Sequence, residues 1–124
     1  MIQIVFVGLG GCLGSVLRYL ISLATSRLFG SQFPWGTLLV NMTGGALIGF
    51  LMAYCIARDV PPEIRLFLTT GFLGGLTTFS TFSYETIQMI LAGNWGIGLL
   101  NIATNLALSL GGVWLGRMAF TMMG

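Results

Sequence analysis

The sequence contains no lysine and no histidine, and its only charged residues are five arginines and three acidic residues. Charged residues make up 6% of the chain, whereas a typical soluble domain has roughly 25%. Because so few charges cannot cover a globular surface, most of this surface must face something other than water. The net charge of +2 is small and dispersed, so we expect no nucleic-acid binding, which needs a concentrated basic surface.

The residue clusters of metal sites and of enzymes are missing too. Cys12 and Cys55 are far apart rather than in a CxxC pair, and no histidine accompanies them. Metal binding by soft ligands and redox chemistry are therefore not expected. No nucleophile is paired with a base that could activate it, so the sequence argues against an enzyme.

What the sequence has instead is long apolar runs. Hydrophobic residues make up 56% of the chain, and a membrane-spanning helix needs about 20 mostly apolar residues in succession. Four stretches fit, and little lies outside them: residues 2–23, 35–57, 64–91 and 95–119. We therefore predict an all-α membrane protein in which residues 1–124 form a single four-helix transmembrane domain.

The predicted connections are residues 25–34, 58–63 and 92–95, and four spans place both chain ends beside the second of these. Three arginines fall on that side and one or two on the other. The distribution of positive charge between the two sides sets the orientation of a membrane protein, so this small bias specifies the orientation only weakly. We expect the chain to insert both ways and to pair as an antiparallel homodimer. Four short helices are in any case too few to enclose a hydrated path.

Small residues recur four positions apart in several predicted spans, as in Gly10/Gly14 and Gly45/Gly49. In membranes this spacing lets two helix backbones approach closely. It predicts tight helix packing and does not indicate what passes between the helices.

Two polar residues lie inside predicted spans and need partners there. A guanidinium in a span costs roughly 2.5–3.5 kcal/mol on the insertion scale. Arg18 therefore either anchors its helix at the membrane interface or forms a fixed positive charge at the mouth of a water-filled vestibule, where it would attract anions. The amide of Asn41 either bonds to a neighbouring helix or donates to an anion through its NH₂ group.

The segment GGLTTFSTFSYE, residues 74–85, concentrates hydroxyl side chains inside an apolar span. Gly74 and Gly75 lower helix stability, and two β-branched threonines follow. We therefore predict that the third helix is broken near its middle. Broken backbone at membrane depth must be buried in protein or line a cavity, and its freed carbonyls can bind a cation. The hydroxyls beyond the break offer donors to an anion.

Phe79 and Phe82 lie three residues apart in this segment and share a helix face. Such a pair commonly makes contact with lipid or with another helix. Here the two rings are interleaved with Ser80 and Thr81, and an aromatic ring has a positive edge. A path lined by ring edges, hydroxyls and an amide could replace part of an anion's hydration without binding it too tightly to release.

Three segments together resemble the CrcB/Fluc family of small fluoride channels: GGCLGSVLRY (10–19), GTLLVNMTGGALIG (36–49) and GFLGGLTTFSTFSYE (71–85). The chain length and the four-span plan fit this family as well. The resemblance implies a dual-topology, antiparallel homodimer with two fluoride pores and one central structural sodium ion. It also implies passive fluoride efflux across the bacterial cytoplasmic (inner) membrane, which relieves fluoride toxicity, with fluoride, a second copy and membrane lipid as partners.

The resemblance also implies roles for individual residues. Arg18 matches the vestibule charge, and the backbone carbonyls of Gly74 and Thr77 match the sodium ligands. The fluoride pore would be lined by Asn41, Phe79, Ser80, Thr81, Phe82 and Ser109. Of these, Ser109 rests on the fourth span, which matches the family pattern more loosely than the third.

Two alternatives remain at this point. A small multidrug-type proton-coupled transporter is also a four-span antiparallel dimer, but it needs a membrane-embedded carboxylate in its first span. Glu85 is the only candidate here, and it lies in the third. A non-transporting subunit of a larger complex is the second alternative. Dependence on a proton gradient distinguishes the transporter from a channel, and activity of the purified chain excludes the subunit.

Overall fold

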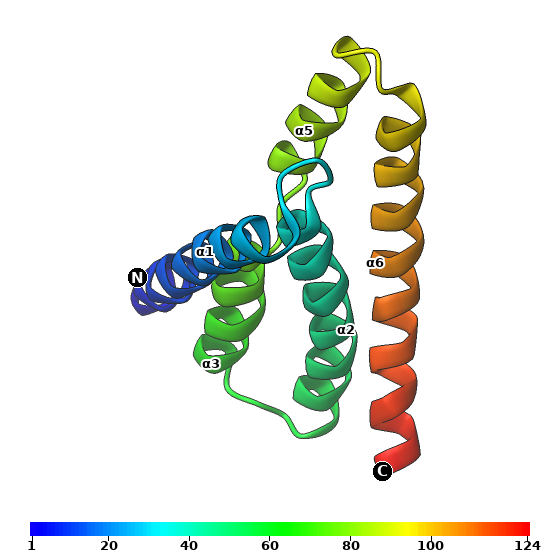
Figure 1. Ribbon diagram of the computed structural model, residues 1–124. Coiled ribbons are helices and arrows are strands. Elements are labelled where there is room, and N and C mark those ends of the chain that lie inside the picture. The colour runs from blue at the N-terminus through cyan, green and yellow to red at the C-terminus, as the bar shows by residue number, and fades with distance from the viewer.

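The computed structural model describes residues 1–124, and every regular element in it is helical (Figure 1). Three long helices are α1 (Ile2–Phe29), α2 (Trp35–Ala57) and α6 (Trp95–Met123). Each is long and apolar enough to cross a membrane. The expected all-helical, multi-pass membrane fold is therefore present.

The segment predicted as the third span, residues 64–91, is built from four shorter pieces that begin at Pro62, and we keep the name third span for residues 62–91. They are α3 (Pro62–Leu66), the π-helix η1 (Phe67–Leu73), α4 (Gly74–Leu76) and α5 (Ser80–Leu91). The backbone leaves the helix at Thr77, whose φ of −82° and ψ of 157° are those of an extended residue. It becomes helical again at Ser80, so the two halves of the span meet at a short non-helical segment, residues 77–79. We call it the extended segment after Thr77, although Phe79 at its end already has helical angles, with φ −90° and ψ −36°.

The end of the first helix differs from the sequence prediction. It runs to Phe29 rather than stopping near residue 23, because nothing before Gly30 breaks it. The hydroxyl of Thr25 donates to the carbonyl of Ile21 at 2.9 Å and so satisfies itself within the helix. Gly30 has a φ of 79° and ends the helix, which shortens the predicted loop to residues 30–34. α6 likewise continues past residue 119 to Met123.

Glycines set the spacing between helices, as the four-residue pattern predicts. α2 lies beside the second half of α6, and α1 crosses the third span (Figure 1). A Cβ added to Gly45 would lie 2.6 Å from the carbonyl oxygen of Ser109, and one added to Gly71 would lie 2.7 Å from that of Val7. No side chain fits at these distances, so the helix backbones are in direct contact there.

The buried core of the chain is small. Only 22 of the 124 residues are buried, and the central cluster consists of Val40, Leu73 and Leu76. Most large apolar side chains are exposed on the chain by itself. In water such a surface would aggregate, so it must be covered by lipid or by another protein surface.

Candidate functional site

A groove of about 350 Å³ opens between α2, the third span and α6. We call it the central groove. No charged side chain lines it. Its polar and aromatic lining consists of Asn41, Thr69, Thr77, Thr78, Phe79, Phe82, Asn105 and Ser109.

The central groove brings together most of the residues that the sequence nominates. Six of the nine predicted site residues line it: Asn41, Gly74, Thr77, Phe79, Phe82 and Ser109. They come from three different helices and converge on the extended segment at 77–79. The other three, Arg18, Ser80 and Thr81, do not line it.

The two phenylalanines form a contacting pair with very different exposure. Their ring centroids lie 5.4 Å apart, with the planes inclined at 55°, which is an attractive arrangement for two aromatic rings. Phe82 is 7% exposed, whereas Phe79 is 75% exposed. A single chain therefore buries Phe82 but leaves Phe79 exposed at the groove.

Asn41 holds the backbone at the extended segment. The N–H of Thr78 donates to Oδ1 of Asn41 at 2.8 Å, and Nδ2 of Asn41 donates to the Thr78 carbonyl at 3.0 Å. The same nitrogen donates to Oδ1 of Asn105 at 2.9 Å. Both amide hydrogens are therefore engaged inside the chain, and Asn41 is a brace for the broken backbone rather than a free donor.

Arg18 reaches the same segment from α1. Its Nε donates to the carbonyl of Gly75 at 3.0 Å, and its guanidinium also approaches the hydroxyl of Thr81, at 3.4 Å. Thr81 lies in the first turn of α5, and its N–H donates to the hydroxyl of Thr78 at 3.1 Å. Ser80 is exposed, with its hydroxyl 3.4 Å from that of Thr78. Arg18 thus uses its Nε–H to bind the C-terminal end of α4, and its side chain is half-buried.

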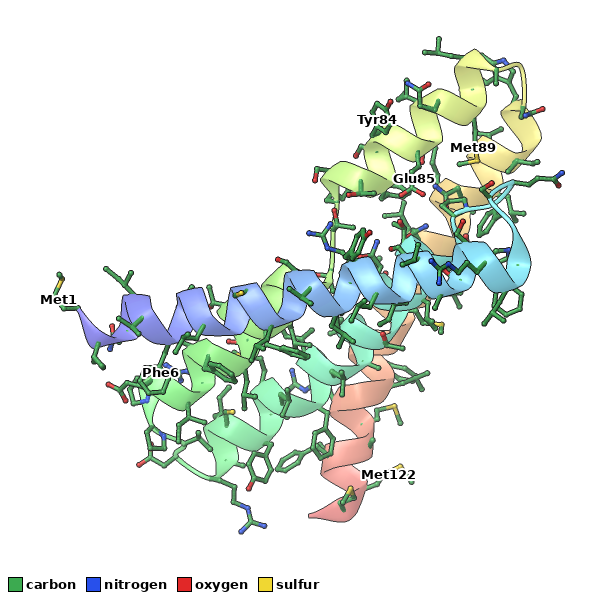
Figure 2. The ribbon with its side chains drawn as sticks, turned by 60° about the vertical axis from the view of Figure 1, so that its left-hand side comes forward. Met1, Phe6, Tyr84, Glu85, Met89 and Met122 are labelled. Carbon is green, nitrogen blue, oxygen red and sulfur yellow. The ribbon has the colours of Figure 1, made fainter.

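A second, more polar hollow of about 310 Å³ lies between residues 30–34 and α5. Glu85 lines it and accepts a hydrogen bond from the hydroxyl of Thr37 at 2.5 Å. Figure 2 shows Glu85 on α5 beside Tyr84 and Met89, which line the same hollow. Glu85 is therefore separate from the central groove.

Sequence reasoning missed Asn101 and Asn105, which are both buried in α6. A signal for them was present, because Asn101, Asn105 and Ser109 recur every four residues in an otherwise apolar helix. Polar residues at this spacing share one helix face and in a membrane face protein rather than lipid. The pattern was weaker than that of the third span because it contains no glycine pair or aromatic residue.

Comparison with known proteins supports a family assignment. The family described as "CrcB-like protein, Camphor Resistance (CrcB)" matches residues 5–117. The chain is 52% identical to the fluoride-specific ion channel FluC of Clostridium novyi (strain NT) over 118 residues, which cover 94% of this chain and 92% of the relative. It is 51% identical to the fluoride-specific ion channel FluC of Shewanella woodyi over 115 residues, covering 93% of each. The chain belongs to the CrcB family of membrane proteins.

Proposed function

We propose that this protein is a fluoride channel through which fluoride leaves the bacterial cytoplasm passively across the inner membrane, which relieves fluoride toxicity. The observation that carries the proposal is the uncharged central groove, where Phe79, Phe82 and Ser109 meet at the extended segment. Relatives that are half identical over nearly the whole chain are named fluoride-specific ion channels, and this favours fluoride as the anion.

The chemistry of the central groove suits weak binding and fast release of an anion. Ring edges and hydroxyl groups offer partial positive charge, and the groove has no arginine that would hold the ion tightly. Conduction needs binding that is favourable enough to enter and weak enough to leave. The roles that the sequence suggested for Arg18, Ser80 and Thr81 fit an approach to this path, since Arg18 contacts Gly75 and Thr81, which flank the extended segment.

The location of Glu85 weighs against a proton-coupled transporter. Such a transporter needs its carboxylate in the substrate path, whereas Glu85 lines the other hollow and accepts a hydrogen bond from Thr37. We therefore favour a channel over this alternative.

A second copy in antiparallel orientation would complete the path. Phe79 is 75% exposed and Gly74 is exposed as well, so one chain leaves the groove open along one side. In our proposal the third span crosses the membrane once, interrupted at residues 77–79. Two-fold symmetry of the dimer then gives two equivalent pores.

A structural sodium ion fits the backbone at the break. Gly74 and Thr77 both line the central groove, and no hydrogen bond outside the regular helices ends on either carbonyl. Carbonyl oxygens are suitable ligands for a hard cation. One chain offers only two such oxygens, so the ion would need the same pair from the partner. When bound, it would neutralise the carbonyl dipoles of the two breaks.

The test is fluoride efflux from liposomes that contain only the purified chain, with the membrane potential clamped by a potassium ionophore. We expect rapid fluoride release without a proton gradient and far slower chloride release. Equal fluoride and chloride rates, or an absolute need for a proton gradient, would contradict the proposal. Absence of any transport by the purified chain would favour a non-transporting subunit.

A further inference from the structure

A continuous chain of side-chain hydrogen bonds connects α2 to α5 through two asparagines of α6. Beyond the Asn41–Asn105 bond, Nδ2 of Asn105 donates to Oδ1 of Asn101 at 2.9 Å. Nδ2 of Asn101 donates to the hydroxyl of Thr86 at 2.9 Å, and this hydroxyl donates to the carbonyl of Phe82 at 2.7 Å. We call this chain, formed by Asn41, Asn105, Asn101 and Thr86, the amide relay.

The direction of every bond in the amide relay is determined by its ends. A backbone N–H can only donate, so the N–H of Thr78 fixes the oxygen of Asn41 toward itself and the nitrogen toward Asn105. The oxygen of Asn105 must then face Asn41, which turns its nitrogen toward Asn101. At the other end, the carbonyl of Phe82 can only accept a hydrogen bond, so the Thr86 hydroxyl donates its single hydrogen to it. The oxygen of that hydroxyl can then only accept, and it does so from Nδ2 of Asn101. Both ends therefore require hydrogen-bond donation to run in the same direction, from Asn41 toward Phe82, and every bond of the relay runs in that direction.

Burial makes the relay costly to interrupt. Asn101 is 0% exposed, and Asn105 and Thr86 are each 4% exposed. A buried amide without a partner loses its solvation and gains nothing, so removing one member strands the donor or acceptor of its neighbour. Simple helix packing would not need this chain, since Thr104 of the same helix satisfies its hydroxyl with the carbonyls of Leu100 and Asn101 in its own helix.

The two ends of the relay are at the phenylalanine pair. One end holds the peptide groups of Thr78, the residue directly before Phe79. The other end holds the carbonyl of Phe82 itself. The straight helix α6, with Asn101 and Asn105 one turn apart, therefore fixes the backbone on both flanks of the ring pair.

We propose that Asn105, Asn101 and Thr86 are positioning residues for the anion path, acting on Phe79 and Phe82 through the amide relay. The inference rests on the proposed function, because it assigns these residues to the same groove. They need not touch the ion. Their effect is to hold the two rings at the separation and tilt that present ring edges to it, and loss of one relay bond should lower fluoride flux about tenfold.

The test uses matched variants of the full chain in liposomes. Asn105→Leu removes the amide at similar size, and Thr86→Val removes only the hydroxyl. The controls are Thr86→Ser, which keeps the hydroxyl, and Thr104→Val, which removes a hydroxyl outside the relay. Fluoride efflux and the fluoride-to-chloride ratio are measured, with size-exclusion chromatography to check assembly.

We expect Asn105→Leu and Thr86→Val to lose flux and selectivity at an unchanged elution volume, while both controls behave as the parent. In the double variant Asn105→Leu/Thr86→Val, the loss of fluoride flux should not exceed the larger of the two single losses, because both changes interrupt the same amide relay. Parental flux and selectivity in both test variants, equal losses in Thr86→Ser and Thr86→Val, or a double loss equal to the product of the single losses would overturn the proposal.

Amide hydrogen exchange separates this inference from the proposed function. If the parent chain moves no fluoride, the relay can still be tested at the Thr78 N–H. Asn105→Leu should speed its exchange, because the brace of Asn41 is loosened, and Thr104→Val should not. Unchanged exchange at Thr78 in Asn105→Leu would overturn the relay whatever the protein transports.

Discussion

Asn41 and Thr78 are joined by two hydrogen bonds of opposite direction, in which the side-chain amide pairs with the N–H and C=O of one backbone residue. The Asn41 amide here supplies the hydrogen-bond partners that the preceding and following turns of a helix would give to the N–H and C=O of Thr78. An unsatisfied backbone group in the membrane interior costs several kcal/mol. The pairing therefore explains how the chain can leave its helix at the groove without exposing bare peptide groups.

The first prediction concerns this pairing. Asn41→Leu keeps the size of the side chain but leaves both Thr78 groups and the Oδ1 of Asn105 without a partner. We expect fluoride efflux to fall by more than tenfold, since each stranded group costs about 1–3 kcal/mol. Thr43→Val is the control, because the hydroxyl of Thr43 bonds only to carbonyls of its own helix. Parental efflux in Asn41→Leu would show that the brace is dispensable.

The second prediction concerns the aromatic rings. Phe79→Ile and Phe82→Ile keep apolar bulk and remove the positive ring edge, so fluoride efflux should fall severely while the dimer still assembles. The Phe79 variant is the cleaner of the two, since that ring is 75% exposed on the chain and contributes little to its packing. Phe29→Ile, at an exposed helix end, should have no effect. If both groove variants conduct normally, the rings serve packing alone.

The strongest local signals in the sequence were sufficient for much of this architecture. The bounds of α2 follow from Trp35 and the charged turn after Ala57. The part of the groove lining that lies in residues 74–82 follows from the glycine pair, the threonines and the two phenylalanines. The end of α1 was less predictable, because the polar residues after Leu23 suit either a loop or a helix. Only the chain's own contacts decide between them.

Other features could not be predicted because they depend on tertiary contacts. The π-helix at Phe67–Leu73 has no distinctive composition, and it lies where α1 contacts the third span. The sequence also left open whether Asn41 bonds to a neighbouring helix or donates to an anion, and in the structure both its amide hydrogens are engaged by Thr78 and Asn105. That outcome depends on which helix lies opposite, which spacing within one helix does not reveal.

The third prediction is dual topology. Arg58, Arg65 and Arg117 oppose only Arg27, with Arg18 further inside, and this bias is too small to select one orientation. A tag at Gly124 should be accessible from both sides of the native membrane in comparable amounts. Two arginines added to the loop at 58–63 should force one orientation and abolish activity, and a partner biased the opposite way should restore it. Labelling from one side only would reject the antiparallel dimer.

The fourth prediction concerns sodium. Prolonged exchange of sodium for a large organic cation should reduce fluoride efflux and loosen the dimer, because the carbonyls at the two breaks would lose their common ligand. Thr77→Ala should be mild in the same assay. Its backbone supplies the oxygen, and its hydroxyl bonds only to the Leu73 carbonyl. Full activity and an unchanged dimer after exhaustive exchange would refute the sodium site.

The last prediction separates the fold of the single chain from its pairing. A Cβ at Gly74 would meet nothing closer than the carbonyl oxygen of Thr69, at 3.8 Å, so the chain itself has room for a side chain there. Gly74→Val should therefore leave the helical content unchanged, as measured by circular dichroism, yet abolish both dimer formation and fluoride efflux. Gly45→Val is the contrast, because its Cβ would lie 2.6 Å from the Ser109 carbonyl and should disrupt the fold itself. A Gly74→Val protein that remains dimeric and conducts fluoride would place the partner, and the sodium ion with it, elsewhere on the chain.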